Sequence, residues 1–250
     1  MGLNDTQLRA GVIGAGVFGG HHARKYAASN RAELVGVYDV HPERANQLAG
    51  DLGCRGFTDV HALIEACDAV TVASPAIAHY EAVKTALNAG RHVLVEKPLA
   101  DTAALGRELV DIARADDLVL QVGHQERFVF NAMGVFDIDA APRRIDARRM
   151  GLRSTRNLDV SVTVDLMIHD LDLVMALAQE VDFVAKTFVN ETGYDLNPDF
   201  AEDPKAKDSL GANVNAFIGS VLDGTPVAVP AEAGLAALAV ARDIDRAAGL

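Results

Sequence analysis

Three polar residues interrupt the apolar segment "DLMIHDLDLVMAL", which begins at Asp165. Asp165, His169 and Asp172 stand at positions i, i+4 and i+7, and in a helix these positions share one stripe. Burying a carboxylate or an imidazole without a partner costs free energy, so the stripe needs partners or a task. A histidine titrates near neutral pH and suits acid–base catalysis. A buried structural network and a zinc site are the alternative interpretations.

A glycine loop near the N-terminus is the second feature with a chemical meaning. "GAGVFG" places Gly14, Gly16 and Gly19 after a short apolar run and at the start of a helical pattern. The first glycine allows a tight turn, the second lets the backbone approach a pyrophosphate, and the third lets the helix pack on the strand. The helix N-terminus then attracts phosphate. We predict a dinucleotide site that includes this loop, with Val17 and Phe18.

An acid follows the glycine loop at the distance that a dinucleotide site requires. Asp39 lies 20 residues after Gly19, at the end of the second apolar run. A carboxylate there accepts hydrogen bonds from the adenosine ribose and repels a 2′-phosphate, so NAD is favoured over NADP as the cofactor. The alternative is a turn acid that caps the helix beginning in "HPERA".

The elements that must hold these residues alternate along the first half of the chain. Short apolar runs predict strands at 8–14, 32–39, 68–74, 91–98 and 118–124, and amphipathic patterns predict helices at 17–29, 42–53, 76–88 and 101–117. This alternation is typical of an α/β fold with a parallel sheet covered on both faces. We predict six parallel strands within residues 1–122. Closing helices, roughly 209–223 and 231–248, should pack on or near them.

Composition excludes several classes of protein. The 250 residues carry a net charge of −12, which argues against a general nucleic-acid partner or an anionic membrane partner. Cys54 and Cys67 form no disulfide framework or metal-ligand spacing. The sequence has no apolar run of membrane-spanning length and no signal-peptide pattern. A cytoplasmic location is therefore expected.

Four stretches, in order, resemble the glucose–fructose oxidoreductase/inositol dehydrogenase/MocA family. They are "GVIGAGVFGGHHARKY", "VASPAIAHYEAVKTALNAGRHVLVEKPLA", "VGHQERF" and "VTVDLMIHDLDLV", and the resemblance covers nearly all of residues 8–180. It implies an NAD(P)-dependent oxidoreductase that transfers hydride between nicotinamide and a secondary alcohol of a sugar, inositol or related polyol. The alternative is a catalytically idle dinucleotide-binding sensor or partner subunit.

The resemblance also assigns roles to residues. It implies that Lys97, Asp165 and His169 are catalytic. His169 would act as general base and Lys97 would stabilise the developing alkoxide, while Asp165 would orient the substrate or the imidazole. Further cofactor contacts are expected, beside Lys97, from Ser74, Pro75, His79 and Glu96. Substrate contacts are expected from His124, Arg127, Arg156 and Asp172, the last of which could instead only support His169. No bound metal is expected.

The second half of the chain departs from the family pattern. Residues 1–122 read as an NAD(P)-binding Rossmann domain and residues 123–250 as a reduced α+β substrate domain. Its only strand candidates are 143–150, 181–189 and "PVAVP". Sheet residues therefore look missing near 180–181, which puts the substrate wall and a possible homo-oligomer interface in doubt. Arginines between 143 and 156 could bind a phosphorylated or nucleotide-linked sugar, although a solvated strand is the favoured interpretation.

Overall fold

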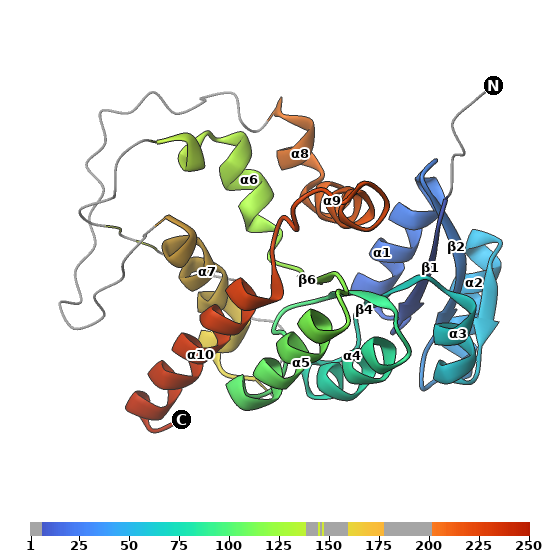
Figure 1. The fold of residues 1–250 in the computed structure, drawn as a ribbon, viewed down its shortest axis with the longest axis horizontal. Coiled ribbons are helices and arrows are strands. Elements are labelled where there is room, and N and C mark those ends of the chain that lie inside the picture. Colours follow the sequence, from blue (N-terminus) through green and yellow to red (C-terminus); the bar gives the residue numbers. More distant parts are fainter. Residues whose placement is uncertain (1–6, 139–144, 146, 148–159, 178–201) are drawn as a thin grey trace.

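The structure is a computed structural model that describes residues 7–138, 145, 147, 160–177 and 202–250. Its centre is one sheet flanked by helices (Figure 1). None of the helices in these ranges is long and apolar enough to cross a membrane.

Six parallel strands form the sheet, in the order β3-β2-β1-β4-β5-β6. They are β1 (Leu8–Ile13), β2 (Ala32–Tyr38), β3 (Arg55–Phe57), β4 (Ala69–Val72), β5 (His92–Val95) and β6 (Leu120–Val122). The prediction of six parallel strands is confirmed. The order reverses between β1 and β4, and ligands of such sheets bind beyond the strand ends at that point.

Helices follow the strands where the pattern placed them. The helices of the first half are α1 (Val17–Ala28), α2 (Pro42–Leu52), α3 (Val60–Ala66), α4 (His79–Asn88) and α5 (Ala103–Ala115), with the 3₁₀ turn η1 (Ala76–Ala78) before α4. Two elements, β3 and α3, had no range of their own in the sequence prediction. At three and seven residues they are too short for periodicity to reveal.

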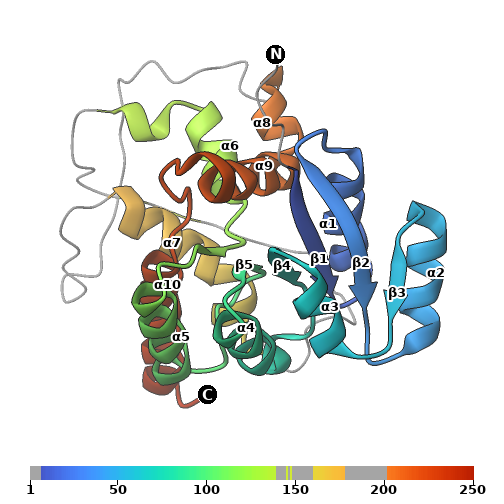
Figure 2. The same cartoon turned by 45° about the vertical axis from the view of Figure 1, so that its right-hand side comes forward.

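Two layers of helices bury the two faces of the sheet (Figure 2). One core cluster joins apolar residues of β1 and β2 to α1, α2 and α9 (Ser209–Asp223). The other joins β4, β5 and β6 to α3, α4, α5 and α10 (Ala231–Ala248). Every residue of β4 is buried, as expected for a strand covered on both sides. The predicted closing helices thus have the expected bounds and pack against the sheet layers.

The other elements that the structure describes in the second half are helical. They are α6 (Glu126–Ala132), the 3₁₀ turn η2 (Val135–Asp137), the π-helical turn η3 (Thr163–Met167), α7 (Ile168–Leu177) and α8 (Pro204–Lys207). The strand expected at "PVAVP" is wrong, because Pro230 forms only an isolated antiparallel bridge with Gln121. The strands expected at 181–189 and, apart from Ile145 and Ala147, at 143–150 lie outside the described residues. The division of the chain at residue 122 stays a prediction.

Candidate active site

A large cleft lies at the carboxyl ends of the central strands. Its volume is about 1290 Å³, above the ~300–1,000 Å³ usual for one small-molecule ligand. The lining combines the glycine loop, the segments after β2, β4 and β5, and the start of the helix with the polar stripe. Twelve of the predicted site residues line it: Gly14, Gly16, Val17, Phe18, Asp39, Ser74, Pro75, His79, Glu96, Lys97, Asp165 and His169.

The glycine loop has the geometry that a bound pyrophosphate requires. Gly14 has a φ of +102°, and a Cβ atom there would lie 2.7 Å from the Ala73 carbonyl oxygen. A Cβ atom on Gly19 would lie 1.7 Å from the Gly14 carbonyl oxygen, so only glycine lets α1 approach the strand end. Gly16, the N-cap of α1, has open space beside it, and the first turn of α1 holds no acid. These residues fit the phosphates of a dinucleotide.

Asp39 lines the cleft and is held there by two main-chain donors. Its Oδ2 atom accepts a hydrogen bond from the Ala15 N–H at 2.8 Å, and its Oδ1 atom accepts one from the His41 N–H at 2.9 Å. Each carboxylate oxygen has capacity for a further donor, such as a ribose hydroxyl. The structure thus shows Asp39 fixing the turn before α2, while its contact with a ribose stays a prediction.

His79 ties together the two loops that form the floor of the cleft. Its Nδ1 atom lies 2.7 Å from the Pro98 carbonyl oxygen, and its Nε2 atom lies 2.8 Å from the Ser74 carbonyl oxygen. Burial lowers the pKa of His79, although the two carbonyl acceptors oppose this shift. The Ser74 hydroxyl is buried and has no hydrogen-bond partner among the described residues, which leaves it available to a ligand.

Glu96 forms a buried hydrogen-bonded pair beneath the cleft. Its Oε1 atom lies 2.6 Å from Nε2 of His22, which is fully buried, and accepts a second hydrogen bond from Gln125 at 3.2 Å. Burial would raise the pKa of the Glu96 carboxyl, but the hydrogen bond and the positive charge around it hold the pKa below its usual value. Glu96 is therefore an anchored anion at the edge of the cleft.

Lys97 and Asp165 form an ion pair across the cleft. The Lys97 ammonium donates to the Asp165 carboxylate at 2.9 Å and to the Asp165 main-chain carbonyl at 2.5 Å. Their side chains are 18% and 25% exposed, so the pair is neither fully buried nor freely solvated. From the family resemblance we expected Asp165 to orient the substrate or the imidazole of His169. The structure shows the Asp165 carboxylate bound to Lys97.

His169 lines the same cleft and contacts residues from the segment after β6. Its Nδ1 atom lies 3.2 Å from the Glu126 carboxylate, and its ring packs edge-on against the His124 ring with centroids 5.7 Å apart. His124 is 1% exposed, and burial lowers its pKa to about 4. His124 thus packs as a neutral ring behind His169.

The polar stripe of the sequence divides between two environments. Asp165 lies in the π-helical turn, while His169 and Asp172 lie in α7. Asp172 is 1% exposed and accepts two hydrogen bonds of 2.7 Å from Arg127. Neither residue of this pair lines the cleft, nor does His124. Asp172 therefore has Arg127 as its hydrogen-bond partner, and its support of His169 stays a prediction.

Gly19 packs α1 against the strand end and does not line the cleft, and Arg156 lies outside the described residues.

The sequence prediction missed three polar residues at the site, which are His22, Gln125 and Glu126. The motifs "GGHHARKY" and "VGHQERF" contain them, but nothing in the sequence showed which side chains point inward. The described residues contain no group of three or more His, Cys, Asp or Glu side chains that could hold a metal ion.

Comparisons with known proteins point to the same cofactor. A sequence profile described as an oxidoreductase family with an NAD-binding Rossmann fold matches residues 8–124. UDP-N-acetylglucosamine 3-dehydrogenase of Acidithiobacillus ferrooxidans is 41% identical over 179 residues, which are 70% of this chain and 56% of that protein. Inositol 2-dehydrogenase of Acidothermus cellulolyticus is 34% identical over 209 residues, which are 77% of this chain and 61% of that protein. The chain thus spans less than two thirds of both relatives.

A solved structure shares the arrangement of the elements. The UDP-N-acetylglucosamine 3-dehydrogenase of Acidithiobacillus ferrooxidans superposes with a TM-score of 0.83 at 28% identity, over 96% of this chain and 97% of that chain. The predicted α/β class with a Rossmann-type parallel sheet is therefore confirmed by the strand order and by this similarity.

Proposed function

This chain belongs to the glucose–fructose oxidoreductase/inositol dehydrogenase/MocA family, whose NAD-binding Rossmann fold covers residues 8–124, and we propose that it is a dehydrogenase. In this proposal it oxidises a secondary hydroxyl of a sugar, inositol or related polyol with NAD. The observation that carries the proposal is the Lys97–Asp165 ion pair, which lies in one cleft with His169 and the glycine loop.

His169 is the proposed general base. Its Nδ1 atom lies 3.2 Å from the Glu126 carboxylate, and this proximity favours the tautomer with the proton on Nδ1, in which Nε2 is the basic nitrogen. That nitrogen takes the proton of the substrate hydroxyl. NAD, if bound in the cleft, would supply the acceptor for the hydride of the same carbon, so that the alcohol would be oxidised to a ketone.

Lys97 is the proposed stabiliser of the developing negative charge. The ammonium donates to the substrate oxygen as that oxygen loses its proton. Asp165 holds the ammonium in the cleft through the 2.9 Å contact. The prediction that Asp165 acts in the site thus takes a more definite form, in which it orients Lys97.

The cofactor contacts follow from the geometry of the loops. Gly14 and Gly16 would hold the pyrophosphate at the start of α1, and Asp39 would accept the ribose hydroxyls. A 2′-phosphate would meet the Asp39 carboxylate, so we propose NAD rather than NADP. Pro75 and the buried Ser74 hydroxyl line the cleft near Lys97 and Glu96, which supports a cofactor contact there.

Substrate oxidation tests the proposal directly. The protein is incubated with NAD and, one at a time, with inositols, free hexoses, glucose 6-phosphate and UDP-N-acetylglucosamine, and NADH formation is followed by absorbance. The names of the relatives support the last compound and the inositols as first choices. We expect one class to be oxidised by the unmodified chain and far more slowly by the His169→Asn variant. Binding of NAD without turnover of any compound would favour the idle binder.

A further inference from the structure

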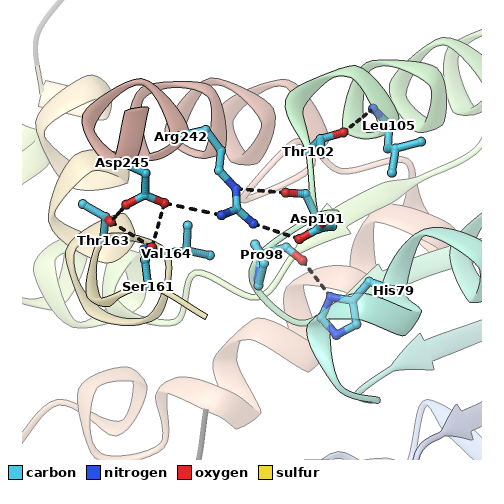
Figure 3. A network of polar contacts seen from close by, with 10 residues as sticks. All are labelled: His79, Pro98, Asp101, Thr102, Leu105, Ser161, Thr163, Val164, Arg242 and Asp245. Carbon is cyan, nitrogen blue, oxygen red and sulfur yellow. Dashed lines mark hydrogen bonds and ion pairs between the residues drawn. The ribbon is translucent and has the colours of Figure 1, made fainter. Parts of the chain in front are cut away.

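The C-terminal helix α10 carries a buried carboxylate that the proposed chemistry does not use. Asp245 is 4% exposed. Its carboxylate accepts hydrogen bonds from the hydroxyl of Ser161, at 2.7 Å, and from the hydroxyl of Thr163 (Figure 3). These donors, together with Arg242, hold the pKa of Asp245 below its usual value against the effect of burial. A buried anion of this kind needs every one of its donors.

The two hydroxyl donors belong to the turn that leads into Asp165. The Val164 N–H donates to the Ser161 hydroxyl at 3.3 Å, and the Asp165 N–H donates to the Ser161 carbonyl at 2.8 Å. Ser161 and Thr163 also lie 2.9 Å apart, oxygen to oxygen. The position of Asp245 therefore fixes the start of the helix that carries Asp165 and His169.

Arg242, one turn before Asp245, binds the segment that follows Lys97 in the chain. Its Nε atom donates to the Asp101 carbonyl and its Nη2 atom to the Asp101 carboxylate, each at 2.9 Å, while Nη1 lies 3.4 Å from Asp245. Asp101 follows Lys97 by four residues. Between them lies Pro98, whose carbonyl is held by His79 (Figure 3). Arg242 thus fixes the chain just after Lys97.

We propose that Arg242 and Asp245 are positioning residues that set Lys97 and Asp165 at their working distance. The inference rests on the proposed function. Neither residue lines the cleft, and both act through the segments that they hold. Because α10 also packs against α5, α7 and η3, it forms a rigid support for both arms of the ion pair. Displacing a reacting group by about 1 Å can cost 10²-fold in rate.

The test compares substitutions at two acids of the same helix. Asp245→Ala removes the buried carboxylate, and Asp245→Asn retains one acceptor oxygen. The matched control is Asp243→Ala, since Asp243 is exposed and pairs with Arg246, which is also exposed. Measurements are kcat, KM for substrate, Kd for NAD, melting temperature, and amide hydrogen exchange of residues 161–168.

We expect Asp245→Ala to lower kcat roughly 10- to 100-fold, with little change in the Kd for NAD. Exchange at Val164 and Asp165 should accelerate, Asp245→Asn should show smaller effects, and Asp243→Ala should match the unmodified protein. If the Asp245 variants lose melting temperature but keep turnover per folded molecule, the network only stabilises the fold and the inference is wrong. If the unmodified chain oxidises no substrate, the proposed function fails. Hydrogen exchange then decides the inference alone, and unchanged exchange in both Asp245 variants overturns it.

Discussion

Replacing Lys97 with methionine removes the ammonium and keeps most of the length of the side chain. The ammonium makes two contacts with Asp165, of 2.9 and 2.5 Å, and it lines the cleft beside His169. Loss of one donor to a developing oxyanion typically lowers kcat about 10²–10³-fold. We expect a loss of that size in Lys97→Met. NAD affinity should hardly change, because the glycine loop and Asp39 hold the other end of the cofactor.

The same substitution should cost little stability. Unit charges 2.9 Å apart attract by about 6 kcal/mol at an effective dielectric constant of 20. Desolvation and side-chain entropy offset most of this, and water reaches Asp165 in the variant because its side chain is 25% exposed. The net loss should be about 1–2 kcal/mol. For a chain of this size that corresponds to about 2–8 °C in melting temperature.

Two further variants separate catalysis from folding. Lys97→Met/Asp165→Asn removes both charges, so it should recover much of the melting temperature while turnover stays low. Lys84→Met breaks a 2.7 Å surface pair with Glu108 outside the cleft and should leave kcat unchanged. Turnover is measured by NADH absorbance, melting by calorimetry and NAD affinity by titration calorimetry. Lys97→Met that turns over like the unmodified chain, or that loses NAD binding as strongly as turnover, would refute the assignment.

Three other predictions follow from the site. Asp39→Ser with Val40→Arg should reverse the preference for NAD over NADP in a binding titration, and an unmodified chain that prefers NADP contradicts the role of Asp39. His169→Asn should lower turnover about 10²–10⁴-fold with unchanged NAD affinity, whereas loss of activity on adding a chelator to the unmodified chain would indicate a metal ligand. The Glu96 carboxyl has a pKa lowered from 4.5, so its contribution to stability is present above pH 4.5 and is lost as the pH falls through the lowered value. Glu96→Gln should therefore flatten the acid limb of unfolding free energy against pH, and an unchanged slope would disprove this contribution of the His22 pair.

The sheet could be predicted because its strands are buried on both faces and bounded by helical patterns. The run Ala69–Val72, for example, is buried throughout and is apolar apart from Thr71, and residues close in sequence decide its type. The glycine loop could be predicted for the same reason, since the requirements at Gly14 and Gly16 come from neighbours within the turn and from the adjacent strand. For the strands and for the glycine loop, neighbouring residues were therefore enough to predict the local structure.

The pairings within the site could not be predicted, because residues far apart in sequence decide them. Lys97 and Asp165 are 68 residues apart, and Glu96 and His22 are 74 apart. The spacing of the polar stripe was predicted correctly, but the partners of its three residues were not. Asp165 contacts Lys97, His169 lies beside Glu126, and Asp172 binds Arg127. A π-helical turn at Thr163–Met167 also separates Asp165 from the regular helix, and no periodic pattern reveals such a turn.

The return of α9 to the first strand has a consequence for the order in which the protein is made. Val214, Phe217 and Ile218 belong to the same buried cluster as Leu8 and Val12. At 5–20 residues per second, a ribosome needs roughly 5–20 s to extend the chain from the end of β6 to these residues. During that interval the nascent sheet has one apolar face without its final cover. This core cluster is therefore completed only after α9 has been made, about ninety residues later in the chain than the last strand of the sheet.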